Sequence, residues 1–286
     1  MAKCHVLALE FLRAVPLATA EAVALRSVLG ILAAGALYGA VVASKFGALR
    51  LRGARLLRRA LAGRRERRVS PGSARITFVC PVTRPAILAR FLDRFLAELD
   101  EPVERLFYPN VGENARVAAR LFNTLAARVE TEFVAFCHQD WGPIDRDWVA
   151  RTLAVFDEHP ACRMVAQIGV RMSKDALGGQ ILDRYACNGV PGSFQLHAPD
   201  EQCFVVPTAQ VRELPFDEAS LPEFHFYAVD YAYELQRRGF EIWSTPALAY
   251  HDSPAGALTS ASFKRARRIL RGKYGPGVVR ATTGWI

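Results

Sequence analysis

The chain has 286 residues, of which 51% are hydrophobic and 23% are charged. This composition excludes an intrinsically disordered chain and a polytopic membrane protein, and the length suits one large domain with or without an appendage. The net charge of +9 is uneven, because residues 1–74 carry +10, residues 75–258 carry −8 and residues 259–286 carry +7. Basic ends around an acidic body indicate a membrane surface rather than nucleic acid as the partner.

The N-terminal region predicts a membrane-associating helix. Residues 27–44 are 18 uncharged, mostly apolar residues, which as a helix span about 27 Å of a bilayer core of roughly 30 Å. Nine arginines follow within residues 50–68, and such a block stays on the cytoplasmic side. The alternative is a helix that packs on the body or lies flat on lipid, since residues 51–62 look amphipathic. We therefore expect the protein at the cytoplasmic face of the membrane, single-pass or peripheral.

After a linker at residues 70–73, strand and helix patterns alternate along the chain. Strands are expected at 76–81, 104–108, 132–137 and 163–168, with helices at 85–99, 114–128 and 147–158 between them, and the first strand reads as buried. This alternation predicts an α/β fold with a mostly parallel sheet covered on both faces, in which ligands bind at the carboxyl ends of the strands.

Beyond residue 170 the pattern loosens, and glycines at positions 178, 179, 189 and 192 indicate loops over a site. Further elements are expected as strands at 202–206, 241–244 and 248–250 and a helix at 225–238.

The C-terminal segment 262–273 predicts a basic amphipathic helix. Phe263, Ala266, Ile269 and Leu270 form a narrow apolar stripe among cations. Such a helix binds a membrane surface or lies solvated at the end of the chain, and the pattern fits both. The expected organisation has three parts: membrane-associating helices at 1–70, a catalytic domain at 71–258 and a basic tail helix at 259–286.

Five motifs in chain order resemble a known family. They are ITFVCPV at the first strand, Asn114-Ala115 with Asn123, VAFCHQDW at the third strand, FHFYAVDYAYELQRRGFEIW and AYHDS. Together they resemble the family 2 glycosyltransferases of GT-A fold, in the StrF-like branch, over about residues 75–255. The resemblance implies a Rossmann-like mixed, mostly parallel sheet flanked by helices. It also implies inverting transfer of a sugar from a nucleotide-diphosphate donor to a glycan or lipid-linked acceptor.

A divalent metal is implied by the same resemblance. Charge develops on the leaving diphosphate, and a cation held at a strand end neutralises it. The family's metal motif is usually Asp-x-Asp, whereas this chain reads His138-Gln139-Asp140. The resemblance implies Asp140 and His251 as ligands of Mn²⁺ or Mg²⁺, and imidazole favours Mn²⁺ or another transition ion. His138 stands where the first Asp would be and is expected to contact nucleotide or metal.

Inverting transfer also needs a general base, which removes the proton of the acceptor hydroxyl. The resemblance implies Asp230, with Glu223 as its rival, although an Asp near a helix start is also favourable with the helix dipole alone. The expected residues of the nucleotide-sugar site are Pro81, Thr83, Arg84, Asn110, His138 and Gln139. The expected residues of the acceptor site are Trp141, Asp200 and Glu223. Trp141 suits the core equally well.

Two other functions are open at this point. A sugar-phosphate nucleotidyltransferase has a related sheet, but it needs a Gly-rich basic loop after the first strand, and CPVTRP contains no glycine. A degenerate domain that only binds nucleotide or a partner would account for the missing first Asp.

Overall fold

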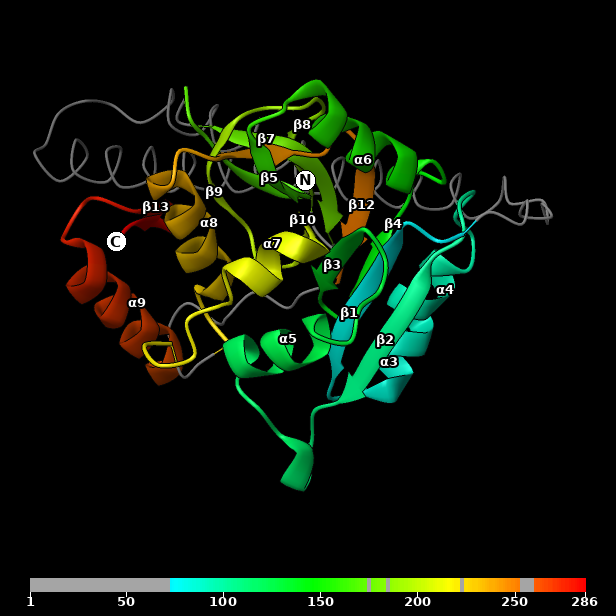
Figure 1. The fold of residues 1–286 in the computed structure, drawn as a ribbon, viewed down its shortest axis with the longest axis horizontal. Helices are drawn as coiled ribbons and strands as arrows, with labels where there is room; N and C mark the ends of the chain where they lie inside the picture. The colour runs from blue at the N-terminus through cyan, green and yellow to red at the C-terminus, as the bar shows by residue number, and fades with distance from the viewer. Residues whose placement is uncertain (1–72, 174–175, 184–185, 222–223, 253–259) are drawn as a thin grey trace, which may run out of the picture. The chain divides into compact units, whose positions relative to one another are not determined.

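Six strands form the first sheet, in the order β11-β5-β10-β3-β1-β2 (Figure 1). They are β1 (Ile76–Val82), β2 (Glu104–Pro109), β3 (Phe133–Cys137), β5 (Cys162–Ala166), β10 (Cys203–Pro207) and β11 (Glu241–Ser244). β1 runs parallel to β2 and β3, β11 runs parallel to β5, and β10 runs antiparallel to both β3 and β5. This sheet is therefore mixed but mainly parallel, as expected.

The second sheet differs from the expectation because most of its pairs are antiparallel. It has the order β4-β12-β7-β6-β9, with β8 paired to β7. Its strands are β4 (Trp141–Pro143), β6 (Ile168–Arg171), β7 (Leu177–Asp183), β8 (Cys187–Val190), β9 (Leu196–Pro199) and β12 (Leu248–His251). Only the β12–β7 pair is parallel among them. The expectation of one mostly parallel sheet is wrong for this half of the fold.

The expected loops around residues 178–192 are in fact the β7–β8 pair. Gly179 has a φ of +81°, and a Cβ there would collide with the carbonyl oxygen of Gln167. Gly189 has a φ of +75°, and its Cβ would collide with the carbonyl oxygen of Gly179. These glycines allow the strands to approach closely, so here glycine is a strand residue rather than a loop signal.

The structure, a computed structural model, describes residues 73–286 except 174–175, 184–185, 222–223 and 253–259. The apolar stretch 27–44 and the basic segment 50–68 lie outside the described residues. None of the helices in the described ranges is both long and apolar enough to cross a bilayer.

Helices cover both faces of the first sheet (Figure 1). They are α3 (Pro85–Arg90), α4 (Leu92–Leu96), α5 (Ala118–Ala126), α6 (Trp148–Glu158), α7 (Thr208–Glu213) and α8 (Tyr227–Arg237). A further helix, α9 (Ala261–Tyr274), lies beside α8 and away from the sheet. A short 3-10 turn, Gly112–Asn114, precedes α5, and a hairpin of β13 (Arg280–Ala281) and β14 (Gly284–Trp285) ends the chain. The single helix expected at 85–99 is two helices, because Phe91 leaves helical geometry with φ −116° and ψ −89°.

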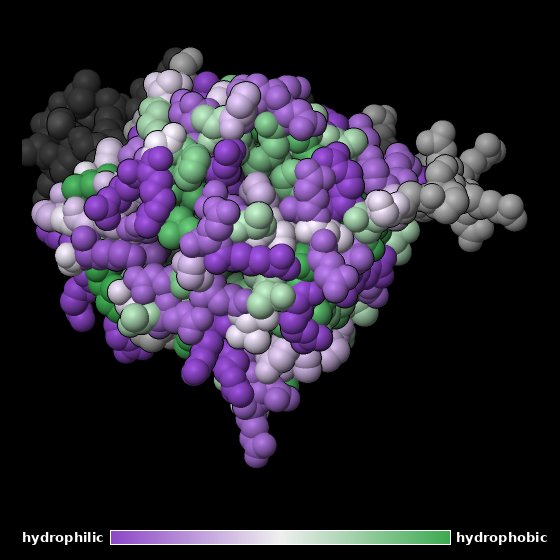
Figure 2. Space-filling view, in the orientation of Figure 1, coloured by the Kyte–Doolittle hydropathy of each residue, from purple (hydrophilic) through white to green (hydrophobic). Residues whose placement is uncertain are grey.

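Two hydrophobic clusters lie on opposite faces of the first sheet, because successive strand residues point to opposite sides. Phe136 and Phe204 pack with residues of α5 and α8, including Phe122 and Tyr231. Phe78 packs with the indoles of α6 and β4 in the other cluster. Hydrophilic residues cover most of the face shown in Figure 2, and the hydrophobic residues on this face form small scattered groups.

α9 packs its apolar stripe inward. Phe263, Ala266 and Leu270 are at most 8% exposed and share a cluster with Phe226 and Val229. The apolar stripe of this helix is therefore part of the core and does not lie on a membrane surface. Only the cationic side of α9 remains at the surface.

Candidate active site

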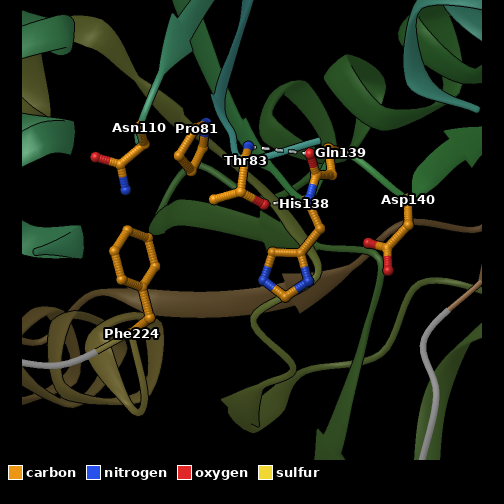
Figure 3. Close-up of a pocket in the computed structure, with 7 residues that line it drawn as sticks. All are labelled: Pro81, Thr83, Asn110, His138, Gln139, Asp140 and Phe224. Atoms are coloured by element: carbon orange, nitrogen blue, oxygen red, sulfur yellow. Dashed lines mark hydrogen bonds between the residues drawn. The ribbon is translucent and has the colours of Figure 1, made fainter. Parts of the chain in front are cut away.

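The carboxyl ends of three neighbouring strands form one pocket. β1 and β2 are in register up to the pair Val82–Pro109, so polar residues that follow these strands lie at the same edge as those after β3. The pocket has a volume of about 240 Å³ (Figure 3). Its lining residues are Pro81, Thr83, Asn110, His138, Gln139, Asp140 and Phe224. Six of these seven are residues that the sequence had suggested for donor or metal.

His138 and Asp140 line this pocket, and His251 lies beside them without being a lining residue; we call these three residues the His-Asp-His cluster. β12 pairs antiparallel with β4, which aligns His251 with Trp141 and so brings it beside Asp140. His251 Nε2 is 3.4 Å from Asp140 Oδ1 and 3.4 Å from His138 Nδ1. One ligand atom from each of the three residues lies within 4.8 Å of the others.

The charges of the His-Asp-His cluster suit a cation. Burial, together with the nearby His251, lowers the pKa of His138 to about 4, so that its imidazole is neutral at neutral pH. Burial alone would raise the pKa of Asp140, but the hydrogen bond and charge of His251 outweigh it and lower that pKa to about 2. An ionised carboxylate and a neutral imidazole are the protonation states that metal coordination requires. The donor set therefore fits a divalent ion, and nitrogen ligands favour a transition metal.

Gln139 holds the turn that follows β1. Its Oε1 accepts hydrogen bonds from the backbone N–H groups of Thr83 and Arg84 at 3.1 and 2.9 Å, and its Nε2 donates to Thr83 Oγ1 at 2.8 Å (Figure 3). Three of the four hydrogen bonds that this amide can form are thus made with protein. Arg84 was expected at the donor site; it is the N-cap residue directly before α3 and is not among the lining residues.

Asn110 has a similar local role at the end of β2. Its Oδ1 accepts from the backbone N–H of Arg116 at 2.7 Å, and its Nδ2 donates to the Arg116 carbonyl at 3.1 Å. The side chain lines the pocket, and these two hydrogen bonds also fix the loop between β2 and α5.

Phe224 is the lining residue that the sequence did not single out. It precedes α8 and is 37% exposed, so its ring is available to a ligand. The ring points toward Asn110 and Pro81 at the opposite end of the pocket from Asp140 (Figure 3). An exposed aromatic face in a polar pocket suits stacking on a planar group. Phe224 begins the FHFYAVDYAYELQRRGFEIW motif, but the motif gave it no role, because it meets the pocket only through the tertiary fold.

Asp230, the expected base, lies under α9 and outside the pocket lining. It is 2% exposed. Lys273 Nζ lies 2.9 and 3.1 Å from its two carboxylate oxygens, and the Tyr274 hydroxyl donates to Oδ1 at 2.6 Å. Lys273 also pairs with Asp217 at 2.8 Å. In this arrangement an acceptor hydroxyl has no access to Asp230, and the carboxylate joins α9 to α8.

Glu201, in the turn before β10, is a second carboxylate and its side chain reaches the start of α8. Its Oε1 accepts a hydrogen bond from the backbone N–H of Ala228 at 3.3 Å. It is only partly buried, yet desolvation raises its pKa to about 8. The carbonyl oxygen of Glu201 accepts from the Tyr227 hydroxyl, which also contacts His138. Glu201 is thereby tied to the His-Asp-His cluster, whereas Asp230 is tied to α9.

The expected acceptor residues separate in the structure. Trp141 is fully buried and packs against Phe78 and Trp148, in keeping with the core alternative. Asp200 Oδ2 accepts from the Thr282 hydroxyl at 3.2 Å and is not among the lining residues. Glu223 lies outside the described residues.

No family model matches this chain, and no curated protein matches its sequence. Solved structures match its fold. The structure of GalNAc-T7 with UDP, GalNAc and Mn²⁺ aligns over 71% of this chain with a TM-score of 0.51 and 9% identity. This chain covers 48% of the length of that one.

Two further matches have a TM-score of 0.46 and 15% identity. One is the mannosyltransferase PcManGT from Pyrobaculum calidifontis with GDP-Man and Mn²⁺, and its match covers 78% of this chain and 69% of that chain. The other is S. aureus TarS 1-349, and its match covers 69% of this chain and 63% of that chain. Likeness at such low identity concerns the fold alone. The likeness to the GalNAc-T7 structure supports a GT-A fold for this chain, which is the fold that the sequence motifs implied.

Proposed function

We propose that this protein is a metal-dependent glycosyltransferase that moves a sugar from a nucleoside-diphosphate donor. The observation that carries the proposal is the His-Asp-His cluster at one end of a pocket built from strand ends in a GT-A fold. The GalNAc-T7 structure, which shares this fold, holds UDP, GalNAc and Mn²⁺. A divalent ion held by His138, Asp140 and His251 would neutralise charge on the departing diphosphate.

The rest of the pocket suits the nucleotide. We propose that the base of the donor stacks on Phe224, at the opposite end of the pocket from Asp140, and that the turn held by Gln139 shapes the site between them (Figure 3). Base stacking on an aromatic ring tolerates every base, so the identity of the nucleotide has to come from other contacts.

For inverting transfer we propose as the general base a carboxylate that contacts or belongs to the first turn of α8. Asp230 is the base that the resemblance predicts, but it is 2% exposed and paired with Lys273. Glu201 is more exposed, and its main chain is linked to His138 through Tyr227. We therefore favour Glu201.

Two amide variants separate these carboxylates. Glu201→Gln should abolish sugar transfer while donor binding persists, whereas Asp230→Asn should mainly lower stability. Transfer should be measured in the folded fraction of each variant, against a melting curve. Full transfer by Glu201→Gln with none by a folded Asp230→Asn would return the role to Asp230.

The acceptor proposal follows from charge. Basic chain ends favour the cytoplasmic face of a membrane. We therefore propose a glycan or lipid-linked acceptor at that face. The cationic side of α9 is exposed, and Arg267 Nη2 donates to the carbonyl of Trp285, whose side chain is 51% exposed. We propose that this surface contacts anionic lipid headgroups without inserting the buried stripe of α9. Flotation with phosphatidylglycerol vesicles should recover the protein, and equal recovery with phosphatidylcholine vesicles would contradict this.

The test of the function is a hydrolysis and transfer screen across nucleotide sugars with added Mn²⁺, comparing the wild type with Asp140→Asn. Turnover of at least one donor that Asp140→Asn loses would support the proposal. Release of pyrophosphate from a nucleoside triphosphate and a sugar phosphate would instead identify a nucleotidyltransferase. Nucleotide binding without any turnover would identify a degenerate binding domain.

A further inference from the structure

The Tyr227 hydroxyl lies between two partners of different kinds. It is the first residue of α8 and is 2% exposed. Its oxygen is 3.1 Å from the carbonyl oxygen of Glu201 and 3.3 Å from Nε2 of His138. His138 in turn presents its other ring nitrogen, Nδ1, to His251 at 3.4 Å.

Counting protons fixes the direction of these hydrogen bonds. A tyrosine hydroxyl has one proton to donate, and a carbonyl oxygen only accepts. The hydroxyl proton therefore goes to Glu201, and the hydroxyl oxygen accepts from His138. His138 must then carry its proton on Nε2, which leaves the lone pair on Nδ1. The reverse arrangement would set the hydroxyl oxygen against the Glu201 carbonyl with no proton between them.

The backbone holds this hydroxyl in place. Phe226, directly before Tyr227, has a φ of +64°, and it is the only residue other than glycine with positive φ in the described ranges. A bulky residue in the left-handed region is strained, and such strain persists only where the surroundings enforce it. The Glu201 carboxylate, which accepts from the Ala228 N–H, fixes the same turn from the other side.

We propose that Tyr227 is a positioning residue that holds His138 as the Nε2–H tautomer and thereby presents Nδ1 to a divalent transition metal. This inference rests on the metal site of the proposed function. It assigns to Tyr227 the role that an outer hydrogen-bond partner has in many histidine sites, where its loss weakens metal binding about 10–100-fold. The role needs a hydroxyl and not merely a ring, so phenylalanine should fill the space without fulfilling it.

The test compares Tyr227→Phe with the wild type in titrations with Mn²⁺ or Co²⁺ alone. We expect the dissociation constant to rise about 10–100-fold. Tyr231→Phe is the matched control, because Tyr231 lies one turn further along α8 and its hydroxyl donates to the Gln210 carbonyl, away from the cluster. That variant should bind the metal like the wild type, and melting curves should show both variants folded.

A second readout needs neither metal nor turnover. In the metal-free wild type, ¹⁵N NMR of labelled histidines should show His138 protonated on Nε2, and Tyr227→Phe should populate the other tautomer. Equal metal affinity of Tyr227→Phe and the wild type would overturn the inference, as would a wild-type His138 protonated on Nδ1. If the wild type itself binds no metal, the metal site of the proposed function fails and the inference falls with it. That result differs from wild-type binding that is insensitive to Tyr227.

Discussion

Lys273 Nζ lies 2.9 Å and 3.1 Å from the two carboxylate oxygens of Asp230, and this contact joins the last turn of α9 to the first turn of α8. Burial alone would lower the pKa of Lys273, but its hydrogen bonds to Asp217 and Asp230 raise it. The basic C-terminal helix is thus fastened by charge as well as by its apolar stripe.

Replacing Lys273 with Met should lower the free energy of unfolding by about 2–3 kcal/mol. The reason is that the substitution leaves the buried carboxylate of Asp230 without its cation. The loss of stability stays below the roughly 3–5 kcal/mol of fully buried pairs because the Lys273 side chain is 24% exposed. Denaturant unfolding measures the change. Arg271→Met, on the exposed side of the same helix, should change stability by about 0.5 kcal/mol or less. A similar loss in both variants would show that the Asp230 contact is not special.

Glu201 should make stability fall as pH rises. Its pKa is raised from 4.5 to about 8 by burial, so between these values the folded chain holds a proton that the unfolded chain has released. The free energy of unfolding then falls with pH, by up to about 1.4 kcal/mol per unit from this group and by less here because Glu201 is partly exposed.

Glu201→Gln cannot titrate and should reduce the loss of stability between pH 5 and pH 8 in thermal melts. The exposed Glu158 provides the control variant Glu158→Gln, which should follow the wild-type profile. An unchanged profile for Glu201→Gln would show that Glu201 is ionised in the folded protein across this range.

His138→Asp should shift metal preference toward Mg²⁺. A second carboxylate replaces a nitrogen ligand with oxygen, and oxygen ligands suit Mg²⁺ whereas imidazole suits transition ions. We expect the ratio of Mg²⁺ to Mn²⁺ affinity, from calorimetric titration, to rise about tenfold or more. His159→Asp is the control, since His159 stacks on Trp243 at 3.5 Å and is not part of the cluster. A ratio that does not change would place the metal away from His138.

Phe224→Ala should weaken nucleotide binding. Loss of one stacked base is worth about 1–3 kcal/mol, which is roughly 5- to 150-fold in dissociation constant. Metal affinity should not change, because Phe224 lies at the other end of the pocket from Asp140 (Figure 3). Trp285→Ala removes another exposed aromatic residue and should bind nucleotide normally. Equal binding by Phe224→Ala and the wild type would remove Phe224 from the donor site.

The strand ends were predictable from sequence because a buried strand has a clear local pattern. Apolar runs ending in polar residues located β1 and β3 and, through them, Pro81 and Asp140. His251 was predicted through the family resemblance. In the structure it meets Asp140 because two short strands pair, β12 with four residues and β4 with three. Strands this short have too few residues for an alternating pattern to be read.

The contacts that sequence did not reveal join distant segments. Lys273 contacts Asp230, which is 43 residues away in the sequence. The periodicity of a basic helix does not predict which carboxylate on another helix it will contact. Tyr227 reads as a core residue of an amphipathic helix, which its ring is, while its hydroxyl touches His138 from 89 residues away. Phe224 reaches the pocket in the same way. A local sequence pattern cannot show that one side chain has two roles, or that a loop reaches a distant pocket through the fold.

The central claim is that the His-Asp-His cluster holds a metal which binds a nucleoside diphosphate. It is tested most directly by calorimetric titration of the full chain with UDP, GDP and dTDP, each with and without Mn²⁺, for the wild type and for Asp140→Asn. We predict that one nucleotide binds the wild type, that Mn²⁺ strengthens this binding, and that Asp140→Asn loses the effect of the metal. Binding of none of the three nucleotides, or binding that is indifferent to both Mn²⁺ and Asp140, would contradict the claim.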